Sequence, residues 1–241
     1  MKAIILAAGK GTRLKPLTDN YPKCMVEFRG KQIIDYILEA LRSKDINDIS
    51  IVKGYKASIL KKEGTKEYIN DLYETTNMVY SLFCSKNEWN DDIIISYSDI
   101  IFNAKHLELL INSESNISVI IDKDWRKLWE KRMDDPLLDA ETLKLDENDN
   151  IIEIGKKPLD YSEINGQYTG LIKIKKNVLL EINNLYDSLD KEAYFDGQTF
   201  KNMYMTSFLQ IIIDRLMPIK AIQVQGGWVE IDTIEDLKRL S

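Results

Sequence analysis

The feature that most constrains this chain is a short apolar run that breaks at once into a glycine-containing loop. Residues 3–6 (Ala-Ile-Ile-Leu) are typical of a strand buried on both faces of a parallel sheet. Residues 7–13 follow as Ala-Ala-Gly-Lys-Gly-Thr-Arg, and small residues let backbone N–H groups approach an anion closely. Arg13 adds a planar fork of donors and Lys23 a compact charge, so we expect a phosphate-binding turn.

Two common phosphate-loop patterns do not fit this turn. Leu14 stands where a dinucleotide-binding fingerprint requires its third glycine, and the glycine-to-lysine spacing of a P-loop is absent. The residues alone therefore leave open an ordinary glycine loop with surface cations.

The rest of the chain alternates between strand and helix patterns. Apolar runs predict strands, listed in order as 49–52, 67–70, 92–97, 117–121, 143–145, 151–154, 167–174, 219–224 and 228–231. Helical spacing or flanking signals predict helices over 33–41, 56–62, 78–85, 178–189, 203–217 and 233–240, and partial helix over 124–139. Such alternation predicts a largely parallel sheet with ligands at the carboxyl ends of its strands.

Composition limits the classes of protein that this chain can represent. The 241 residues are 44% hydrophobic and 30% charged, which supplies one sizeable core. The net charge of -6 and the absence of a Lys/Arg block argue against nucleic-acid binding. No apolar run is long enough for a membrane span or a secretory signal, so we expect a cytoplasmic protein without membrane association. Cys24 and Cys84 lack metal-ligand spacing and are expected to be reduced.

Two aspartates follow predicted strands in a way that suits metal binding. Asp99 ends the run at 92–97, and Asp232 follows the run at 228–231. Two carboxylates bridged by substrate phosphates are a usual way for proteins to hold Mg²⁺. For Asp232 the alternative is a helix N-cap, with Thr233 as the other candidate cap. The single histidine, His106, is interpreted as structural because nothing nearby orients it as a base.

The opening stretch resembles the signature of nucleotidyltransferases that activate phosphorylated metabolites, of the form L-A-A-G-x-G-T-R-L-x-P-L-T with a later P-K. Here it reads Leu-Ala-Ala-Gly-Lys-Gly-Thr-Arg-Leu-Lys-Pro-Leu-Thr over 6–18, with Pro22 and Lys23. The resemblance covers nearly the whole chain. It implies a Rossmann-like α/β fold, with a mixed, mostly parallel sheet flanked by helices and a small acceptor-binding subregion. It also implies one domain, 1–241, with a nucleotide-binding half (1–115) and an acceptor-binding half (116–241).

Departures from the sugar-phosphate branch indicate a different acceptor. Sugar-1-phosphate members carry Glu-Lys-Pro, whereas this chain has Lys156-Lys157-Pro158. The chain is more similar to small-acceptor cytidylyltransferases acting on phosphocholine, aminoethylphosphonate or phosphoglutamine. Its sequences at 124–129, 139–142, 155–157 and 204–210 most resemble the branch that acts on phosphoglutamine in capsule phosphoramidate synthesis.

The resemblance implies a Mg²⁺-dependent transfer of CMP from CTP to a small phosphorylated amine or amide, with pyrophosphate as the other product. Capsule or surface-glycan modification would be its context. Alternatives are a sugar-1-phosphate nucleotidyltransferase, a phosphocholine or 2-aminoethylphosphonate cytidylyltransferase, and a nucleotide-binding regulatory domain without chemistry. The oligomeric state is left open.

The resemblance also assigns residues to roles. The catalytic set is Arg13, Lys23, Asp99, Lys157 and Asp232, with Asp99 and Asp232 as the metal ligands. The nucleotide set is Leu6, Ala7, Ala8, Gly9, Gly11, Thr12, Arg13, Lys23, Gly54, Thr76, Asn77 and Ser98. The acceptor set is Trp125, Arg126, Glu141, Lys156, Lys157, Tyr168, Thr169, Gly170, Tyr204, Trp228 and Glu230.

Residue chemistry leaves the nature of the acceptor open. A zwitterionic acceptor would find charged partners among Arg126, Lys127, Arg132, Asp139 and Glu141. A choline acceptor would favour an aromatic cage, for which Trp125, Trp129, Tyr168 and Trp228 are available. Trp129 and Tyr204 are equally well explained as core residues.

Overall fold

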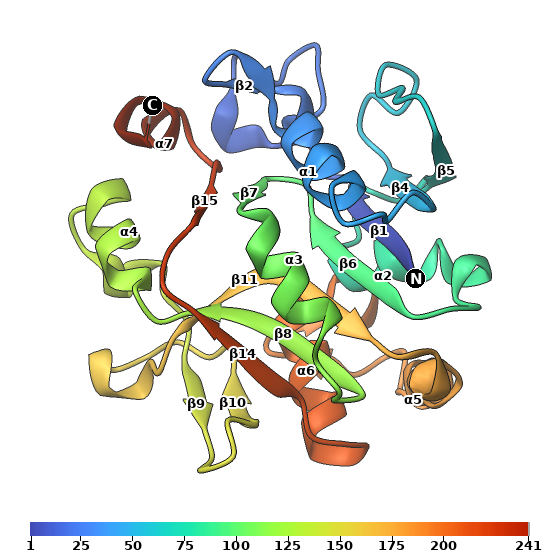
Figure 1. Cartoon of the computed structure of the whole chain (residues 1–241), viewed down its shortest axis with the longest axis vertical. Helices are drawn as coiled ribbons and strands as arrows, with labels where there is room; N and C mark the ends of the chain where they lie inside the picture. Colours follow the sequence, from blue (N-terminus) through green and yellow to red (C-terminus); the bar gives the residue numbers. More distant parts are fainter. Residues whose placement is uncertain (241) are drawn as a thin grey trace.

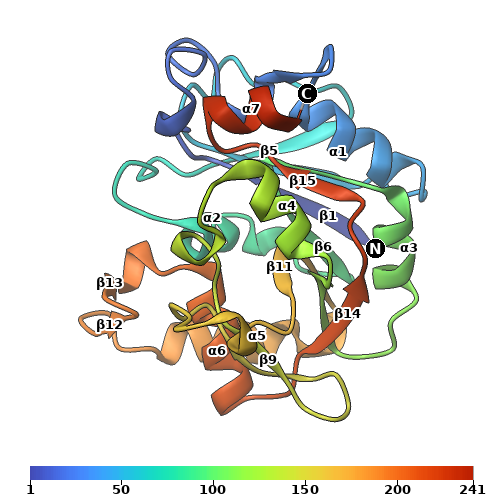
Figure 2. The same ribbon diagram turned by 90° about the vertical axis from the view of Figure 1, so that its left-hand side faces the viewer.

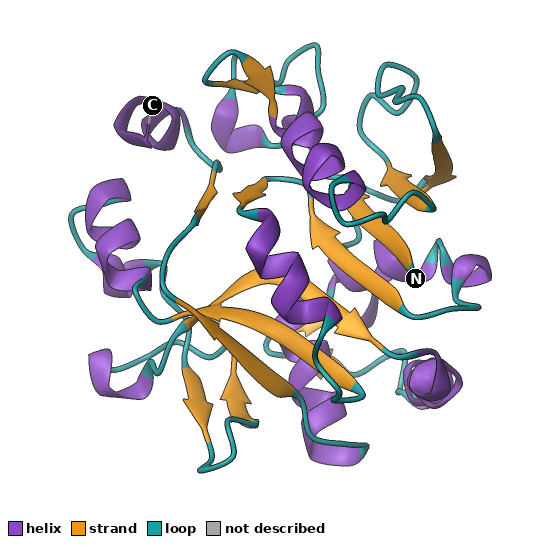
Figure 3. Ribbon diagram, viewed as in Figure 1, coloured by secondary structure: helices purple, strands orange, loops and turns teal. Residues whose placement is uncertain are grey.

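A seven-stranded sheet forms the centre of the protein, as seen in a computed structural model that describes residues 1–240 (Figures 1 and 3). The strand order is β14-β8-β11-β6-β1-β4-β5, and only β11 runs antiparallel to its neighbours. The strands are β1 (Lys2–Ala7), β4 (Ile49–Lys53), β5 (Thr65–Ile69), β6 (Ile93–Tyr97), β8 (Ile117–Asp122), β11 (Gln167–Ile174) and β14 (Lys220–Val224). The predicted mixed, mostly parallel sheet is confirmed.

The central strand β1 explains why the opening sequence is so apolar. It pairs in parallel with β4, where Ala3 lies opposite Ile49, and with β6, where Ile4 lies opposite Ile95. Residues 3–7 of β1 are all buried, because both faces of the sheet are covered. The loop after Ala7 therefore emerges at the carboxyl edge of the sheet, between two parallel neighbours.

Helices cover both faces of the sheet (Figure 2). Alternate residues of β1 divide between two hydrophobic clusters: Ala3 and Ile5 pack with α1 and α3, and Ile4 and Leu6 pack with α2, α5 and α6. The helices are α1 (Ile33–Arg42), α2 (Met78–Phe83), α3 (Ala104–Ile111), α4 (Trp125–Arg132), α5 (Leu179–Ser188), α6 (Met205–Arg215) and α7 (Ile234–Leu240).

Four small two-stranded sheets complete the fold. One of them, β15 (Trp228–Glu230) with β7 (Ile100–Phe102), lies next to the carboxyl edge of the central sheet and bears on the site. The others are β2 (Glu27–Phe28) with β3 (Lys31–Gln32), β9 (Leu143–Leu145) with β10 (Ile151–Ile154), and β12 (Tyr194–Phe195) with β13 (Gln198–Thr199).

The predicted helix over 56–62 is wrong. Residues 55–59 form turns, and Lys56 has a left-handed backbone (φ 51°), which an α-helix cannot accommodate. The expected partial helix over 124–139 is confirmed as α4 followed by a short 3₁₀ turn, Pro136–Leu138. Cys24 and Cys84 are free thiols, as predicted. Within residues 1–240, no helix combines the length and apolarity needed to cross a membrane.

Candidate active site

Local backbone geometry explains the presence of Gly11 and Thr18 in the signature loop. Gly11 has a φ of 61°, and a Cβ at this position would lie 2.8 Å from Cβ of Lys23. The Thr18 hydroxyl donates to the Gly11 carbonyl at 2.8 Å and closes the loop on itself. These contacts place Lys23 beside the loop, although eleven residues or more separate it from the glycines in sequence.

A small antiparallel ladder brings the two predicted metal ligands together. Asp99 precedes β7 and Asp232 follows β15, and these two strands pair with each other. The Ile231 N–H donates to the Asp99 carbonyl at 2.9 Å, so the backbones stay in register up to the aspartates. Thr233, whose hydroxyl accepts from the Asp236 N–H at 3.0 Å, caps α7. The Asp232 side chain is therefore not the cap.

Lys23 joins the two aspartates directly. Its ammonium lies 2.6 Å from Oδ2 of Asp99 and 2.6 Å from Oδ1 of Asp232. Arg13 forms an ion pair with the other oxygen of Asp232. Burial lowers the pKa of Lys23, but Asp99, Asp232 and Glu230 outweigh this effect and raise its pKa above the usual value. The predicted catalytic group is thus a compact charged cluster, with the exception of Lys157.

The two aspartates suit a divalent cation. Oδ1 of Asp99 is buried and has no hydrogen-bond partner among the described residues, which leaves a ligand oxygen available. Both side chains offer the hard oxygen donors that Mg²⁺ and similar ions prefer. The described residues contain no group of three or more His, Cys, Asp or Glu side chains arranged for a metal. Two carboxylates completed by substrate phosphates therefore match this donor set.

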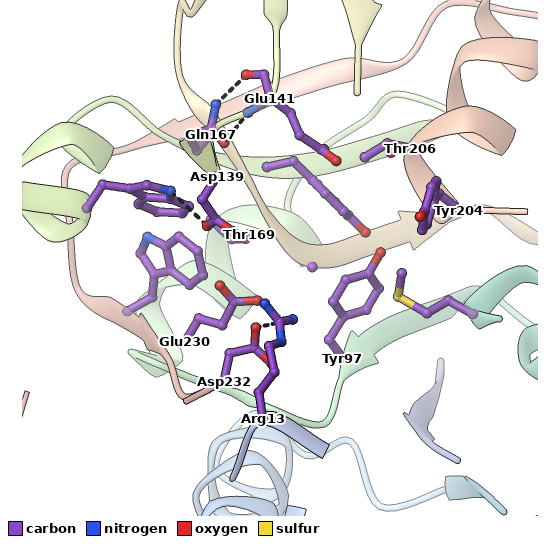
Figure 4. Close-up of a pocket in the computed structure, with 15 residues that line it drawn as sticks. Arg13, Tyr97, Asp139, Glu141, Gln167, Thr169, Tyr204, Thr206, Glu230 and Asp232 are labelled. Carbon is purple, nitrogen blue, oxygen red and sulfur yellow. Dashed lines mark hydrogen bonds and ion pairs between the residues drawn. The ribbon is translucent and has the colours of Figure 1, made fainter. Parts of the chain in front are cut away.

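Two adjoining cavities open around this cluster. The smaller, about 110 Å³, is lined by Leu6, Ala7, Gly9, Lys23, Cys24, Met78, Tyr97, Ser98 and Asp99. The larger, about 260 Å³, is lined by Arg13, Met78, Tyr97, Trp129, Asp139, Glu141, Gln167, Tyr168, Thr169, Gly170, Tyr204, Thr206, Trp228, Glu230 and Asp232 (Figure 4). Met78 and Tyr97 line both, so the wall between them is shared.

The antiparallel strand β11 forms the floor of the larger cavity. Its pairing with β8 shifts register between Tyr168 and Ile172, and Gly170 there has a φ of 85°. A Cβ on Gly170 would lie 2.8 Å from the Tyr97 ring, so glycine permits that ring to lie against the strand. The Thr169 hydroxyl donates a hydrogen bond to the Ile120 carbonyl at 3.2 Å. The hydroxyl of Tyr168 is buried without a described partner.

The far end of the larger cavity is acidic. Glu141 and Thr206 lie across the cavity from Arg13 and Asp232 (Figure 4). Burial, with the nearby charges of Asp139 and Asp196, raises the pKa of Glu141 to about 7. Asp139 accepts a hydrogen bond from the Trp129 indole at 3.1 Å.

A buried arginine connects α4 to the aspartate cluster. Arg132, at the end of α4, donates to Asp236 at 2.8 Å and to Glu230 at 2.8 Å. The second oxygen of Asp236 accepts from the backbone N–H groups of Asp232 at 3.0 Å and Thr233 at 2.8 Å. Burial raises the pKa of Glu230 to about 7, and Arg132 opposes this rise. Of the residues suggested as charged partners of a zwitterionic acceptor, Arg132 is thus already paired within the protein. Lys127 likewise forms an ion pair with Asp124.

Most of the expected site residues lie at the two cavities. Of the nucleotide set, Leu6, Ala7, Gly9, Lys23 and Ser98 line the smaller cavity. Of the acceptor set, Glu141, Tyr168, Thr169, Gly170, Tyr204, Trp228 and Glu230 line the larger one. Gly11 shapes the loop, and Gly54 packs on it, since a Cβ there would lie 2.7 Å from the Ala8 carbonyl.

Some expected residues line neither cavity: Ala8, Thr12, Thr76, Asn77, Trp125, Arg126, Lys156 and Lys157. Asn77 caps α2. Trp125 is a core residue that meets Trp129 edge to face, and Arg126 stacks on Tyr161 at 4.0 Å. Lys156 pairs with Glu153, and the Lys157 ammonium donates to the carbonyls of Leu137 and Leu138. In this arrangement neither lysine faces the larger cavity.

Sequence reasoning missed five residues that line the two cavities: Cys24, Met78, Tyr97, Gln167 and Thr206. Tyr97 and Gln167 lie at the ends of predicted strands, and this position is the one feature of the sequence that could have indicated a place at the cavity. The edge of a sheet collects strand ends, but the pattern does not tell which end faces a cavity.

Comparison with known proteins agrees with this geometry. The family profile described as nucleotidyl transferase matches residues 2–87. The chain is 47% identical to CTP:phosphoglutamine cytidylyltransferase of Campylobacter jejuni, over 99% of this chain and 98% of that protein. It is 42% identical to choline-phosphate cytidylyltransferase of Streptococcus pneumoniae, over 42% of this chain and 46% of that protein. The inositol-1-phosphate CTP transferase of T. maritima superposes with a TM-score of 0.76 at 25% identity, covering 98% and 90% of the two chains.

The chain belongs to the nucleotidyltransferase family and is a nucleotidyltransferase enzyme. The resemblance in its opening stretch is therefore confirmed, as is the fold class that it implied. Members of this family generally use a divalent metal ion, which agrees with the donor set at Asp99 and Asp232.

Proposed function

We propose that this enzyme is a Mg²⁺-dependent cytidylyltransferase that transfers CMP from CTP to a small phosphorylated amine or amide of the phosphoglutamine type. The observation that carries the proposal is the Lys23–Asp99–Asp232 cluster at the junction of two cavities. The full-length likeness to a phosphoglutamine cytidylyltransferase supports both the nucleotide and the acceptor. A role in capsule or surface-glycan modification, in the cytoplasm, accompanies this assignment, with residues 1–115 binding nucleotide and 116–241 binding acceptor.

The reaction needs no covalent intermediate with the protein. An oxygen of the acceptor phosphate forms a bond to the α-phosphorus of CTP, and the bond from that phosphorus to the pyrophosphate oxygen breaks. Lys23 and Arg13 bind phosphate oxygens and stabilise the charge that develops on them. Asp99 and Asp232 would hold Mg²⁺, which when bound neutralises phosphate charge. Lys23 and Arg13 must exchange aspartate contacts for phosphate contacts as substrate enters.

The aromatic lining favours a second candidate acceptor, phosphocholine. Trp129 and Trp228 line the larger cavity with ring centroids 5.9 Å apart, and Tyr97 and Tyr168 meet edge to face at 5.7 Å. Such rings attract quaternary ammonium groups. A regulatory domain without chemistry is disfavoured because Arg13, Lys23, Asp99 and Asp232 are all present and in contact.

Pyrophosphate release is the direct test. The assay pairs each of four nucleoside triphosphates with phosphoglutamine, phosphocholine, 2-aminoethylphosphonate and glucose 1-phosphate. We expect the highest kcat/KM with CTP and phosphoglutamine. Turnover of glucose 1-phosphate alone would contradict the proposed acceptor class, and silence with every acceptor despite tight nucleotide binding would support a regulatory role. Calorimetry of CTP against UTP tests the base, since a mismatched exocyclic group leaves a buried partner unpaired.

A further inference from the structure

One carboxylate in the larger cavity differs from all the others because it lacks a partner. Arg13 pairs with Asp232, Arg132 pairs with Glu230, and the Trp129 indole donates to Asp139. Within residues 1–240, no side chain or backbone group donates a hydrogen bond to the Glu141 carboxylate. Glu141 is half-buried and lines the cavity, so its carboxylate is open to a ligand that can donate to it.

The main chain of Glu141 is held by a buried glutamine. Oε1 of Gln167 accepts from the Glu141 N–H at 3.2 Å, and Nε2 of Gln167 donates to the Glu141 carbonyl at 2.5 Å. Gln167 is 5% exposed and stands at the start of β11, the rigid floor of the cavity. Its amide therefore fixes the backbone of Glu141 and leaves the carboxylate free to face the cavity (Figure 4).

We propose that the Glu141 carboxylate, fixed in place by Gln167, receives an ammonium group of the acceptor. This inference rests on the proposed function and names the acceptor more closely: a molecule with a phosphate at one end and an ammonium group at the other. The phosphate end meets Lys23 and Arg13, and the ammonium end meets Glu141 across the cavity. Hydroxyl groups of a sugar would donate hydrogen bonds to Glu141 but would leave its charge uncompensated.

Protonation of Glu141 gives the inference a pH signature. Burial first, and then the charges of Asp139 and Asp196, raise the pKa of Glu141 to about 7, and the charge of Glu141 in turn contributes to the raised pKa of Tyr97 and of Tyr168. Below this pH the carboxyl group is neutral and attracts an ammonium group less. The preference for an ammonium-bearing acceptor should therefore weaken as the pH falls from 8 to 6.

The test uses phosphoglutamine and the analogue that lacks only its α-amino group. We expect the wild-type enzyme to favour phosphoglutamine in kcat/KM by about thirtyfold or more, as for other buried charge pairs. Glu141→Gln should abolish this ratio by weakening turnover of phosphoglutamine alone, and should remove its dependence on pH. Glu130→Gln is the matched charge control and should keep the ratio, since Glu130 lines neither cavity and forms only an exposed pair with Arg126.

Two outcomes would overturn the inference, and they differ from each other. If Glu141→Gln keeps the wild-type ratio, Glu141 does not bind the ammonium group, and the proposed function stands. If the wild-type enzyme turns over neither acceptor, the proposed function fails and this inference fails with it. CTP calorimetry and the thermal melting point of Glu141→Gln establish that the variant is folded, so an unchanged ratio cannot be attributed to misfolding.

Discussion

The two cavities are built in different ways. Most of the smaller one is lined by a single stretch, residues 6–24, in which Gly11 shapes the backbone and Lys23 adds a charge, and Met78 and residues 97–99 complete it. The larger one is assembled from side chains of distant segments, around Glu141, Gln167, Tyr204 and Trp228. Backbone geometry can be maintained by a short motif, whereas a wall of side chains can change one residue at a time. The opening motif can therefore stay constant within a family while the larger cavity changes.

The largest expected effect tests whether the buried contacts of Arg132 hold α4 to the segment that carries Asp232. Arg132→Met removes the arginine partner of the buried Asp236 carboxylate and of the half-buried Glu230 carboxylate. We expect a loss of about 3–5 kcal/mol in the free energy of unfolding, measured by urea denaturation. Arg126→Met, on the same helix, removes an exposed pair with Glu130 and a cation–π contact with Tyr161, and should cost about 1 kcal/mol. Similar losses in both variants would show that Arg132 is not a specific link.

The next effect concerns activity at the junction of the cavities. Asp99→Asn and Asp232→Asn keep shape but remove a hard anionic ligand, so we expect kcat to fall about a hundredfold or more. Stability should change little for Asp232→Asn, because Thr233 caps α7. Asp91→Asn, beyond the opposite end of β6, is the matched control. Normal turnover of either site variant at limiting Mg²⁺ would exclude that residue as a ligand.

The third prediction concerns the effect of the Glu141 carboxylate on the free energy of unfolding. The pKa of Glu141 is raised to about 7 in the folded protein, so the folded state binds more protons than the unfolded state between about pH 4.5 and pH 7. Its contribution to stability therefore falls as the pH rises through this window. Glu141→Gln should stabilise the protein at pH 8 but not at pH 4, by at most about 3 kcal/mol. Equal melting-point shifts at both pH values would contradict this.

The sequence predicts the smaller cavity better than the larger one. The signature and the strand ends predicted Lys23, Asp99 and Asp232 as one group, and the three side chains are in contact because parallel strands bring their carboxyl ends to one edge. The antiparallel direction of β11 and the positions of Tyr97 and Gln167 were not foreseen. Helical or strand periodicity reports which residues are buried, but not which buried residues border a cavity.

A fourth prediction separates backbone strain from crowding in the signature loop. Gly11→Ala places a Cβ against Lys23 at a left-handed position, while Gly30→Ala is left-handed with nothing within 4 Å. Each should lose about 1–2 kcal/mol of stability from the backbone conformation. Only Gly11→Ala should also weaken CTP binding in calorimetry, because Lys23 must move. Unchanged CTP affinity in Gly11→Ala would show that the loop tolerates the displacement.

The smallest expected effect concerns the two lysines that replace the Glu-Lys pair of the sugar-phosphate branch. The family resemblance placed Lys157 in the catalytic and acceptor sets, but its ammonium donates to the carbonyls of Leu137 and Leu138, just before Asp139. Lys157→Ala should therefore raise the acceptor KM several-fold, equivalent to about 1 kcal/mol, with CTP binding unchanged. Lys156→Ala removes only an exposed pair with Glu153 and should behave like the wild type.

The size of the Lys157 effect distinguishes two roles for this residue. A loss of kcat by about a hundredfold would mean that Lys157 leaves the two carbonyls and binds the acceptor phosphate during turnover, as the family resemblance implies. A several-fold rise in KM alone would mean that Lys157 anchors the segment that leads to Asp139 and Glu141. If both lysine variants match the wild type, neither role holds, and the replacement of glutamate by Lys156 would no longer argue against a sugar phosphate.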